Sequence, residues 1–491
     1  MIAMASPSDD QINSFLKSSE QAAKTISEAI SQNGLIQVFS HLDADGIAAA
    51  GIVGKALYRK DARFQIRITQ WIENKIVDEV LAEKPQLIIF TDLGSGYVDI
   101  LNQKLADFRL VIVDHHQVVD KESQNFVHVN PHLHGLDGAK DISGSGVAYF
   151  VAKALDKINI DLAPVAVVGA LGDLQDKYDQ RLLGGLNARI VEDATSAGLL
   201  TVEKDLIFFG RETRPILKAL ASTTNPFIPG ISGDEEKSLA FLKSLNIEPK
   251  NGDKWRALRD LSDDEKKRLC SRLADHLVAM GLHYEVTNLI GHVYTLTHEE
   301  PWTPLRDARE FAVLLNGTGR MDKAGLGVAV CMGDRACALD EANRVLEEYR
   351  RTINKYLSWV MEKPERMKEF KNIYVVYGED FINDKMVGAV SSILTSSLPN
   401  PEKPLIAYAN LQEEGIAKIS ARTMDTVISK GVNLGEVMQV AAEKYKGKGG
   451  GHNIAAGAQV PIEEISNFIQ TVDELIAKEL KGEKIGSGSQ A

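Results

Sequence analysis

The strongest constraint on the fold is an alternation of short apolar segments with amphipathic segments in the first part of the chain. The apolar segments have the length of buried strands, and the amphipathic segments repeat their apolar residues at helical spacing. Strands that alternate with helices in this way are typical of a largely parallel sheet covered by helices, so we predict an α/β fold. The expected strands are 35–40, 64–69, 86–93 and 109–114, and the expected helices are 8–33, 47–60, 72–84 and 97–106.

Polar residues follow three of these strands directly. The segment HLDADG (41–46) follows the first strand, TDLGSG (91–96) ends the third, and DHH (114–116) ends the fourth. In open parallel sheets, ligands bind outside the carboxyl ends of the strands. We therefore expect these three segments to line a common site.

The segment 41–46 has the pattern of a metal site. His41, Asp43 and Asp45 occupy alternate positions, so their side chains share one side of an extended segment. Gly46 permits a tight turn after them. A single acidic residue at this point would be typical of a helix cap. Three potential ligands at alternate positions favour metal binding instead.

Two further places supply similar side chains. Asp92 alone would be an ordinary residue at a strand end, but two adjacent histidines after an aspartate at the lip of an apolar strand indicate metal binding. Asp173 lies in the apolar run VVGALGDLQD, and buried acids are usually paired or bound to metal. Asp176 is expected either to support such a site or to be exposed. The loop histidines are expected to be solvated: His128, His132 and His134.

These side chains together favour a pair of divalent cations. Carboxylates suit hard ions such as magnesium, and the imidazoles shift the preference towards manganese. Two such ions about 4 Å apart can hold the attacking and leaving oxygens of a phosphoryl group and activate water. The chain has no GxxxxGK[ST] motif for ATP phosphates. The residues therefore predict a metal-dependent phosphoesterase.

Composition restricts the class of protein. A chain of 491 residues is long enough for several domains, and none of its segments has the roughly 20 apolar residues of a membrane-spanning helix. With 56 basic and 68 acidic residues, the net charge of −12 is untypical of a DNA-coating protein but allows a local basic groove. Three cysteines without a CxxC pair, and an N-terminus without the pattern of a signal peptide, predict a cytoplasmic protein.

The rest of the chain divides into a helical middle part and a second α/β part. Residues 201–285 have mostly helical spacing, strand-like runs return between 289 and 334, and a long helix is expected over 336–363. From 371 onwards, a strand, a helix, a hairpin and a closing helix over 462–481 repeat the α/β pattern. The predicted domains are 1–200, 201–365 and 366–485, followed by a flexible tail over 486–491.

The motifs HLDADG, TDLG, VDHH and ALGDLQD, in this order, resemble those of the DHH phosphoesterase superfamily. Near the C-terminus, ISAR (419–422) and GKGGGHNIAAGA (447–458) look like its DHH-associated substrate-binding domain. The spacing of His41 from Asp43 is most similar to RecJ-type nucleases of archaea. The resemblance covers most of 35–200 and 370–480. It implies an N-terminal parallel-sheet DHH domain, a largely helical middle insertion and a C-terminal α/β DHH-associated domain.

The resemblance also implies a role for each matching residue. The implied ligands are, for one metal ion, His41, Asp43 and Asp92, and, for the other, Asp45, Asp92, His115 and Asp173, so that Asp92 would bridge the pair. His116 would face the scissile phosphate as an electrostatic stabiliser or proton donor. Asp114 would orient a ligand through a hydrogen bond.

The C-terminal motifs are implied to bind substrate. The glycines Gly449, Gly450 and Gly451 would let backbone amides approach a phosphate closely, and His452 would hydrogen-bond it. Ser420 and Arg422 occupy alternate positions of a strand, and an arginine suits a bidentate phosphate contact. Without the resemblance, the glycine-rich segment would be equally typical of a surface loop.

The function predicted from these observations is exonucleolytic hydrolysis of single-stranded DNA or RNA to mononucleotides in replication or repair. The expected cofactors are two divalent ions, manganese in preference to magnesium. One alternative is a phosphodiesterase for short oligonucleotides or nucleotides, and another is a replication scaffold with little catalysis. The resemblance further implies GINS, a component of the replicative helicase, as a partner. A surface within 201–365 either binds this partner or braces the two outer domains.

Overall fold

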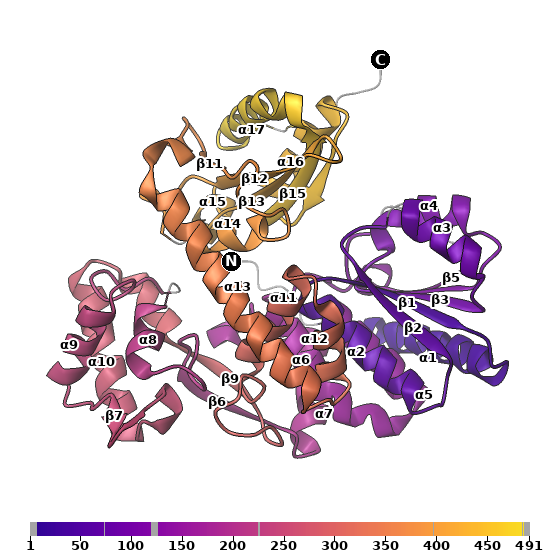
Figure 1. Ribbon diagram of the computed structural model, residues 1–491, viewed down its shortest axis with the longest axis horizontal. Coiled ribbons are helices and arrows are strands. Elements are labelled where there is room, and N and C mark those ends of the chain that lie inside the picture. Colours follow the sequence, from indigo (N-terminus) through magenta and orange to yellow (C-terminus); the bar gives the residue numbers. More distant parts are fainter. Residues whose placement is uncertain are drawn as a thin grey trace. The chain divides into compact units, whose positions relative to one another are not determined.

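A computed structural model describes residues 7–72, 74–118, 126–223, 226–395, 397–483 and 485. The chain divides into two compact units, which we call unit 1 (Met1–Leu346) and unit 2 (Glu347–Ala491) (Figure 1). The division into domains over 1–200, 201–365 and 366–485 stays a prediction, and the expected flexible tail lies outside the described residues.

Unit 1 begins with a five-stranded parallel sheet in the order β2-β1-β3-β4-β5. Helices cover both of its faces, so the predicted α/β fold is confirmed (Figure 1). The strands are β1 Ile36–His41, β2 Phe64–Thr69, β3 Leu87–Thr91, β4 Leu110–Val113 and β5 Phe126–Val129. The helices around it are α1 Asp9–Ser31, α2 Ala44–Tyr58, α3 Asn74–Glu83, α4 Val98–Lys104, α5 Gly144–Leu155, α6 Ala163–Gly172 and α7 Gly185–Ser196.

The central strands are apolar on both sides because both sides are covered. All residues of β3 and β4 are buried, as are five of the six in β1. Phe39, Ile88 and Phe90 pack with apolar residues of α3 and α4, while α2 and α5 contact the sheet as well. The apolar runs in the sequence therefore correspond to the middle of the sheet.

The register of the strands brings the polar motifs to one edge. Ser40 of β1 pairs with Thr91 of β3, and Thr91 pairs with Val113 of β4. The residues that follow these positions are His41, Asp92 and Asp114. The expectation that the ends of three strands meet is confirmed.

Strand β5 follows a loop that the sequence pattern did not assign to the sheet. His128 lies on this strand, and one of its ring nitrogens, Nε2, is 2.9 Å from Ser95 Oγ. His132 and His134 lie in a short 3-10 helix (Pro131–His134), and the three histidines are partly buried. The expectation that they are solvated is wrong, because β5 pairs with β4 and both β5 and the short 3-10 helix contact α1.

The second half of unit 1 contains a helical lobe, followed by two helices that pack against helices of the first half. Apolar residues of the lobe form a core of their own. Helices α11 and α12 then pack against α2 and α6. The elements are β6 Leu200–Leu206, α8 Ile216–Ala221, α9 Glu235–Ser244, β7 Lys250–Asn251, β8 Lys254–Trp255, α10 Asp263–Ala279, β9 Ile290–Leu296, α11 Ala308–Arg320 and α12 Ala324–Cys331. Of the strand-like runs expected between 289 and 334, β9 is a strand, whereas the apolar run 324–331 forms α12, because periodicity cannot distinguish a short buried strand from a buried helix.

Unit 2 is built on a six-stranded mixed sheet in the order β10-β11-β12-β13-β15-β14. Helix α14 contacts β12 and β13, and α16 contacts β14 and β15. The predicted hairpin is formed by β12 and β13. The strands are β10 Met367–Glu369, β11 Tyr374–Tyr377, β12 Leu405–Leu411, β13 Ile416–Arg422, β14 Lys448–Gly451 and β15 Ala455–Pro461, and the helices are α14 Val387–Thr395, α15 Asp425–Ile428, α16 Leu434–Lys444 and α17 Ile465–Glu479.

The longest helix, α13 Cys337–Glu362, contains the boundary between the two units. Among the helices in the described part of the chain, none combines the length and apolar character required to cross a bilayer.

Candidate metal centre

The first motif joins the end of β1 to the start of α2. Asp43 caps α2, because its Oδ1 accepts a hydrogen bond of 3.0 Å from the amide of Gly46. Its Oδ2 lies 3.0 Å from His41 Nδ1. A Cβ atom at residue 46 would lie 2.3 Å from the His41 carbonyl oxygen, so the turn requires glycine. One carboxylate therefore caps the helix and also faces the site.

Asp45 is fixed by the start of another helix. Its Oδ2 accepts a hydrogen bond of 2.6 Å from the Gly144 amide, and its Oδ1 accepts one of 3.1 Å from the Ser145 amide. Both amides lie at the N-terminus of α5, where the helix favours a negative charge. A Cβ atom at residue 144 would lie 2.4 Å from Asp92 Oδ1, so Asp45 and Asp92 meet at this glycine. The sequence analysis did not assign residues 144 and 145 to the site.

Asp92 occupies the middle of the site in an unusual backbone conformation. Its φ angle is +52°, in the left-handed region that non-glycine residues rarely adopt. Its Oδ1 is 3.2 Å from His115 Nε2, and its Oδ2 is 3.9 Å from His41 Nδ1. Burial, together with the negative charges of Asp45 and Asp43, raises its pKa well above the ordinary range. This carboxylate therefore lacks sufficient positive charge around it.

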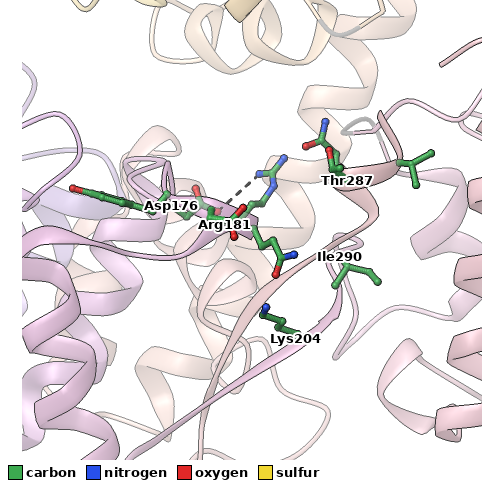
Figure 2. A pocket seen from close by; sticks show the side chains of 10 residues that line it. Asp176, Arg181, Lys204, Thr287 and Ile290 are labelled. Atoms are coloured by element: carbon green, nitrogen blue, oxygen red, sulfur yellow. Dashed lines mark ion pairs between the residues drawn. The ribbon is translucent and has the colours of Figure 1, made fainter. Parts of the chain in front are cut away.

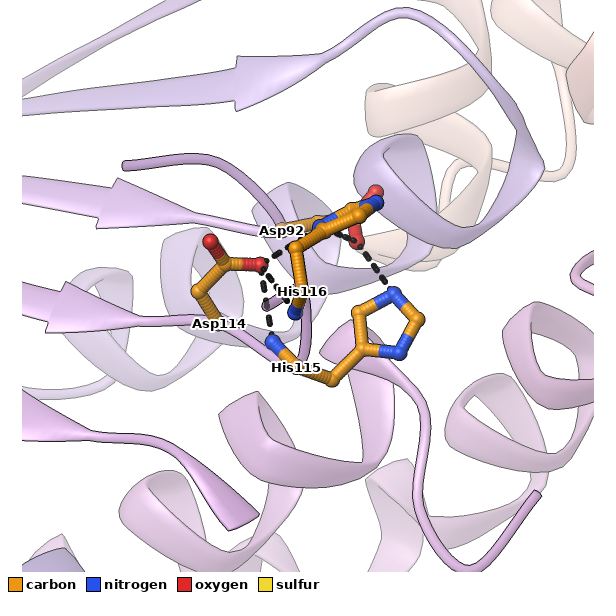
Figure 3. A group of neighbouring side chains, drawn as sticks. All are labelled: Asp92, Asp114, His115 and His116. Atoms are coloured by element: carbon orange, nitrogen blue, oxygen red, sulfur yellow. Dashed lines mark hydrogen bonds and ion pairs between the residues drawn. The ribbon is translucent and has the colours of Figure 1, made fainter. Parts of the chain in front are cut away.

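The histidine pair after β4 is organised by Asp114 (Figure 3). The Oδ1 atom of Asp114 accepts a hydrogen bond of 2.7 Å from the His115 amide and lies 2.8 Å from His116 Nδ1, while its Oδ2 accepts from the Ser95 amide at 2.9 Å. Burial opposes ionisation of Asp114, but the adjacent His116 outweighs it and lowers the pKa of this carboxyl group. In turn, burial opposes the charged form of His116, but Asp114 prevails and raises its pKa to about 9.

His115 points one ring nitrogen into the site. Its Nδ1 is 2.6 Å from the carbonyl oxygen of Gly138, which fixes a proton on this nitrogen. The other nitrogen, Nε2, faces Asp92 and Asp45 Oδ2, which is 3.8 Å away, and offers its lone pair to the site when it carries no proton. This tautomer is the one that a metal-binding histidine requires.

Asp173 reaches the site from the C-terminal end of α6. Its Oδ2 lies 3.9 Å from His115 Nδ1 and accepts a hydrogen bond of 2.9 Å from Gln175 Nε2. The fully buried Gln175 also donates to the Gly138 carbonyl oxygen at 2.8 Å, and its Oε1 accepts from Asn187 at 2.7 Å. Gln175 therefore contacts Asp173 directly and also contacts the Gly138 carbonyl oxygen that lies against His115. A glutamine in a polar stretch gave no sequence signal for this role.

Asp176 does not join the cluster of potential metal ligands. Its carboxylate instead accepts a hydrogen bond of 2.7 Å from Arg309. Asp176 also lines a pocket of about 720 Å³ with Arg181 and Lys204 (Figure 2). Asp179 adds a second acid to the lining, so acids and bases are balanced there. The pocket therefore has no clear preference for anions or cations.

The side chains predicted as ligands come together in overlapping groups. His41, Asp43 and Asp92 form one group, and Asp45, His115 and Asp173 form another, with ligand atoms in each group within 4.8 Å of one another. Asp92 also groups with the DHH motif. Among the described residues, neither His41 Nδ1 nor Asp92 Oδ1 has a hydrogen-bond partner although both atoms are buried. Buried acids with unsatisfied polar atoms fit divalent cations as missing partners.

The residues predicted to bind substrate lie on β13 and on or directly after β14, two strands of unit 2 that β15 separates. Arg422 of β13 pairs with Ala455 of β15, and Gly451 of β14 pairs with Ala456. The Gly449–Gly451 segment, which a surface-loop interpretation also allowed, is an edge strand, and the amide of His452 donates to the Ala455 carbonyl oxygen at 2.9 Å.

The predicted common face of Ser420 and Arg422 is present. Ser420 Oγ is 2.9 Å from Ser391 Oγ, and Arg422 Nε donates to Ser392 Oγ at 2.9 Å, so both side chains contact α14. Ser420 is buried. Its hydroxyl therefore contributes to the packing of the sheet on α14.

Three family models match this chain. The N-terminal domain of the DHH family matches residues 35–170, the DHH-CID domain matches 208–290, and the DHHA1 domain matches 371–478. An uncharacterised protein of Methanocaldococcus jannaschii, MJ0831, is 32% identical over 474 residues, which are 95% of this chain and 99% of that protein. The chain belongs to the DHH family. This conclusion agrees with the resemblance seen in its motifs.

Further comparisons identify this DHH protein as RecJ-like. The single-stranded-DNA-specific exonuclease RecJ of Bacillus subtilis is 21% identical over 94% of this chain, which spans about half (48%) of that protein. RecJ of Thermus thermophilus, in a structure with Mn²⁺, has a TM-score of 0.57 at 17% identity over 94% of this chain and 55% of that one. CDC45 of Entamoeba histolytica has a TM-score of 0.63 at 11% identity, over 94% of this chain and 99% of that one. These structures share the fold of this DHH protein.

Proposed function

We propose that this DHH protein is a metal-dependent exonuclease that hydrolyses single-stranded DNA or RNA to mononucleotides in replication or repair. The observation that carries the proposal is the convergence of six potential ligands, the buried Asp92 among them, in overlapping groups. The proposed ligands are His41, Asp43 and Asp92 for one ion and Asp45, Asp92, His115 and Asp173 for the other. We expect manganese to be preferred, because imidazoles accompany the carboxylates, with magnesium as the second choice.

The bound ions would polarise the phosphodiester and lower the pKa of the attacking water. His116 is half-exposed beside Asp92, and its pKa of about 9 keeps it positively charged at neutral pH. It is therefore suited to stabilise negative charge on the phosphate or to donate a proton to the leaving oxygen. Asp114 holds His116 in this state and orientation through the contact between its Oδ1 and His116 Nδ1.

We assign substrate contacts to unit 2. The backbone amides of Gly449, Gly450 and Gly451, with His452 and Arg422, would bind phosphates of the strand, while Ser420 would support this edge of the sheet. Residue 451 has φ of +133°, a conformation that is strained for residues other than glycine. The relatives named as single-strand DNA exonucleases support single strands as the substrate class.

The decisive experiment is incubation of the purified protein with end-labelled single-stranded DNA and RNA of several lengths, in Mn²⁺, Mg²⁺ or a chelator. We expect mononucleotide products from long single strands, no products in the chelator, and little cleavage of blunt duplexes. Cleavage confined to di- and trinucleotides would instead support a short-oligonucleotide phosphodiesterase. No hydrolysis with any of these metals would support a scaffold.

We also propose that this DHH protein is cytoplasmic and that it binds the GINS complex. The resemblance to archaeal RecJ-type nucleases supports such a partner, and the charged helix α10 offers surface for it, with Asp263, Asp264 and Glu265 in its first turn. The test is a pull-down of GINS with the intact chain and with charge-reversal variants within 201–365. Binding retained by every folded variant would place the docking surface elsewhere and favour a bracing role for this region.

A further inference from the structure

Leu174 is an apolar residue next to the proposed metal ligand Asp173. Its position is fixed on both sides, since Asp173 caps α6 and Gln175 is fully buried with its side chain bonded to Asp173. The residue itself is 68% exposed. An isolated exposed leucine is common on protein surfaces, so exposure alone has no functional meaning.

The backbone makes this leucine unusual. Its φ angle is +54°, and the amide of Gln175 donates to the Ala170 carbonyl oxygen at 3.0 Å, so the end of α6 turns through a left-handed residue. Helices that end in this way generally place glycine or asparagine there, because a side chain with a Cβ atom is strained in this conformation. A leucine here destabilises the folded chain relative to glycine.

Seven other helices in the described part of the chain end in the same way, five of them with glycine or asparagine and two with another polar residue. Each has a left-handed residue directly after its C-cap, and each of these residues is glycine or polar: Asn33 after α1, Gly198 after α7, Asn246 after α9, Gly281 after α10, Asp322 after α11, Gly333 after α12 and Lys446 after α16. The strained apolar residue occurs at the helix end that carries a proposed metal ligand. Strain retained at such a place points to function.

We propose that Leu174 packs against the sugar or base of the nucleotide whose phosphodiester is cleaved. This inference rests on the proposed function and adds a residue that positions the substrate. A nucleotide presents a charged phosphate to the metal centre and an apolar face of base or sugar beside it. Leu174 would supply an apolar contact next to Asp173 in the chain, whereas the side chains of the proposed metal centre are charged or polar.

The test compares Leu174→Gly, Leu174→Met and the backbone-matched control Asn246→Gly. Asn246 is an exposed residue with φ of +53° after α9, in the helical lobe. Binding of fluorescein-labelled single-stranded DNA is measured by anisotropy in Ca²⁺, melting temperature by fluorimetry, and hydrolysis in Mn²⁺. Leu174→Gly should raise the melting temperature by roughly 1–2 °C. It should nevertheless weaken DNA binding about tenfold, since an apolar contact is lost.

Leu174→Met should bind DNA like the wild type, because it keeps an apolar side chain. Asn246→Gly should also bind DNA like the wild type, because it relieves backbone strain only in the helical lobe. Binding by Leu174→Gly within twofold of the wild type would overturn the inference while leaving the nuclease proposal intact. A lower melting temperature for Leu174→Gly would also overturn it, since the leucine would then be structural. A wild-type chain that neither binds nor cleaves single strands would overturn both proposals.

Discussion

The proposed metal centre of unit 1 and the glycine-rich edge of unit 2 would bind a phosphate in two different ways. In unit 1, acidic side chains converge from the ends of β1, β3, β4 and α6, and Asp92 at their centre is buried with a raised pKa. In unit 2, the proposed contacts come from strands β13 and β14, and they consist of backbone amides, an arginine and a histidine. The first arrangement repels an anion unless cations are present, and the second attracts one by itself.

This difference predicts that metal and substrate can be separated by mutation. Loss of a ligand in unit 1 should change metal content and catalysis together. Loss of a contact in unit 2 should change substrate affinity and leave metal content unchanged. Four experiments test the comparison, from the largest expected effect to the smallest.

Asp92→Asn should have the largest effect. Because Asp92 is proposed to bridge both ions, activity should fall at least about a thousandfold and the content of bound Mn²⁺ should fall. In a chelator, however, the variant should melt no lower than the wild type, because burial and the charges of Asp45 and Asp43 disfavour the ionised carboxyl group. The measurements are hydrolysis, metal analysis and melting with and without Mn²⁺. Asp99→Asn on the exposed side of α4 is the control, and normal metal content in Asp92→Asn would contradict the proposed centre.

Gln175→Ala should have the next largest effect, although it is not a proposed ligand. Its hydrogen bonds to Asp173 and to the Gly138 carbonyl oxygen orient two ligands, and loss of such support typically weakens metal binding about 10- to 100-fold. Titration of the metal-free protein with Mn²⁺ measures the change. Excess Mn²⁺ should restore much of the activity. The exposed Gln439→Ala of α16 is the matched control, and unchanged affinity in Gln175→Ala would assign it a packing role only.

Arg422→Ala and His452→Ala should weaken single-strand binding about tenfold while metal content stays the same. Each variant removes a proposed phosphate contact of unit 2, so KM should rise more than kcat falls. The measurements are anisotropy with labelled DNA, steady-state kinetics and metal analysis. Arg344→Ala, at an exposed arginine of α13, is the control. Loss of metal from either variant would contradict the proposal that unit 1 binds metal and unit 2 binds substrate.

Addition of Mn²⁺ without substrate should have a small, local effect. Hydrogen exchange of backbone amides should slow in the segments that carry the proposed ligands and in residues 144–146, whose amides donate to Asp45 or to the Ser143 hydroxyl that caps α5. Exchange in β13, β14 and β15 should remain unchanged. Mass spectrometry of peptic peptides, prepared after deuterium labelling of the intact chain, would measure both. Slowing in the strands of unit 2 would show that metal binding also orders the substrate edge.

The sequence alone specified the parallel sheet and the positions of its acidic motifs. Apolar strands that alternate with helices have few alternative folds, and the ends of parallel strands must meet at one edge. His41, Asp92 and Asp114 could therefore be assigned to one site before the structure was considered. Alternation also placed Ser420 and Arg422 on the same face of β13, as the contacts of both with α14 confirm.

Only the tertiary structure decided which distant groups support this site. The amides of residues 144 and 145 that bind Asp45, and Gln175 with its bonds to Asp173 and Gly138, come from separate segments that folding brings together. Helix α11 contributes Asn316, whose Oδ1 accepts a hydrogen bond of 3.1 Å from the Ala44 amide, although 272 residues separate the two in the chain. Periodicity records which face of a segment is apolar, and it contains no information about which distant segment packs against that face. Most of the proposed ligands could thus be predicted from strand ends, whereas the hydrogen bonds that orient them depend on long-range packing.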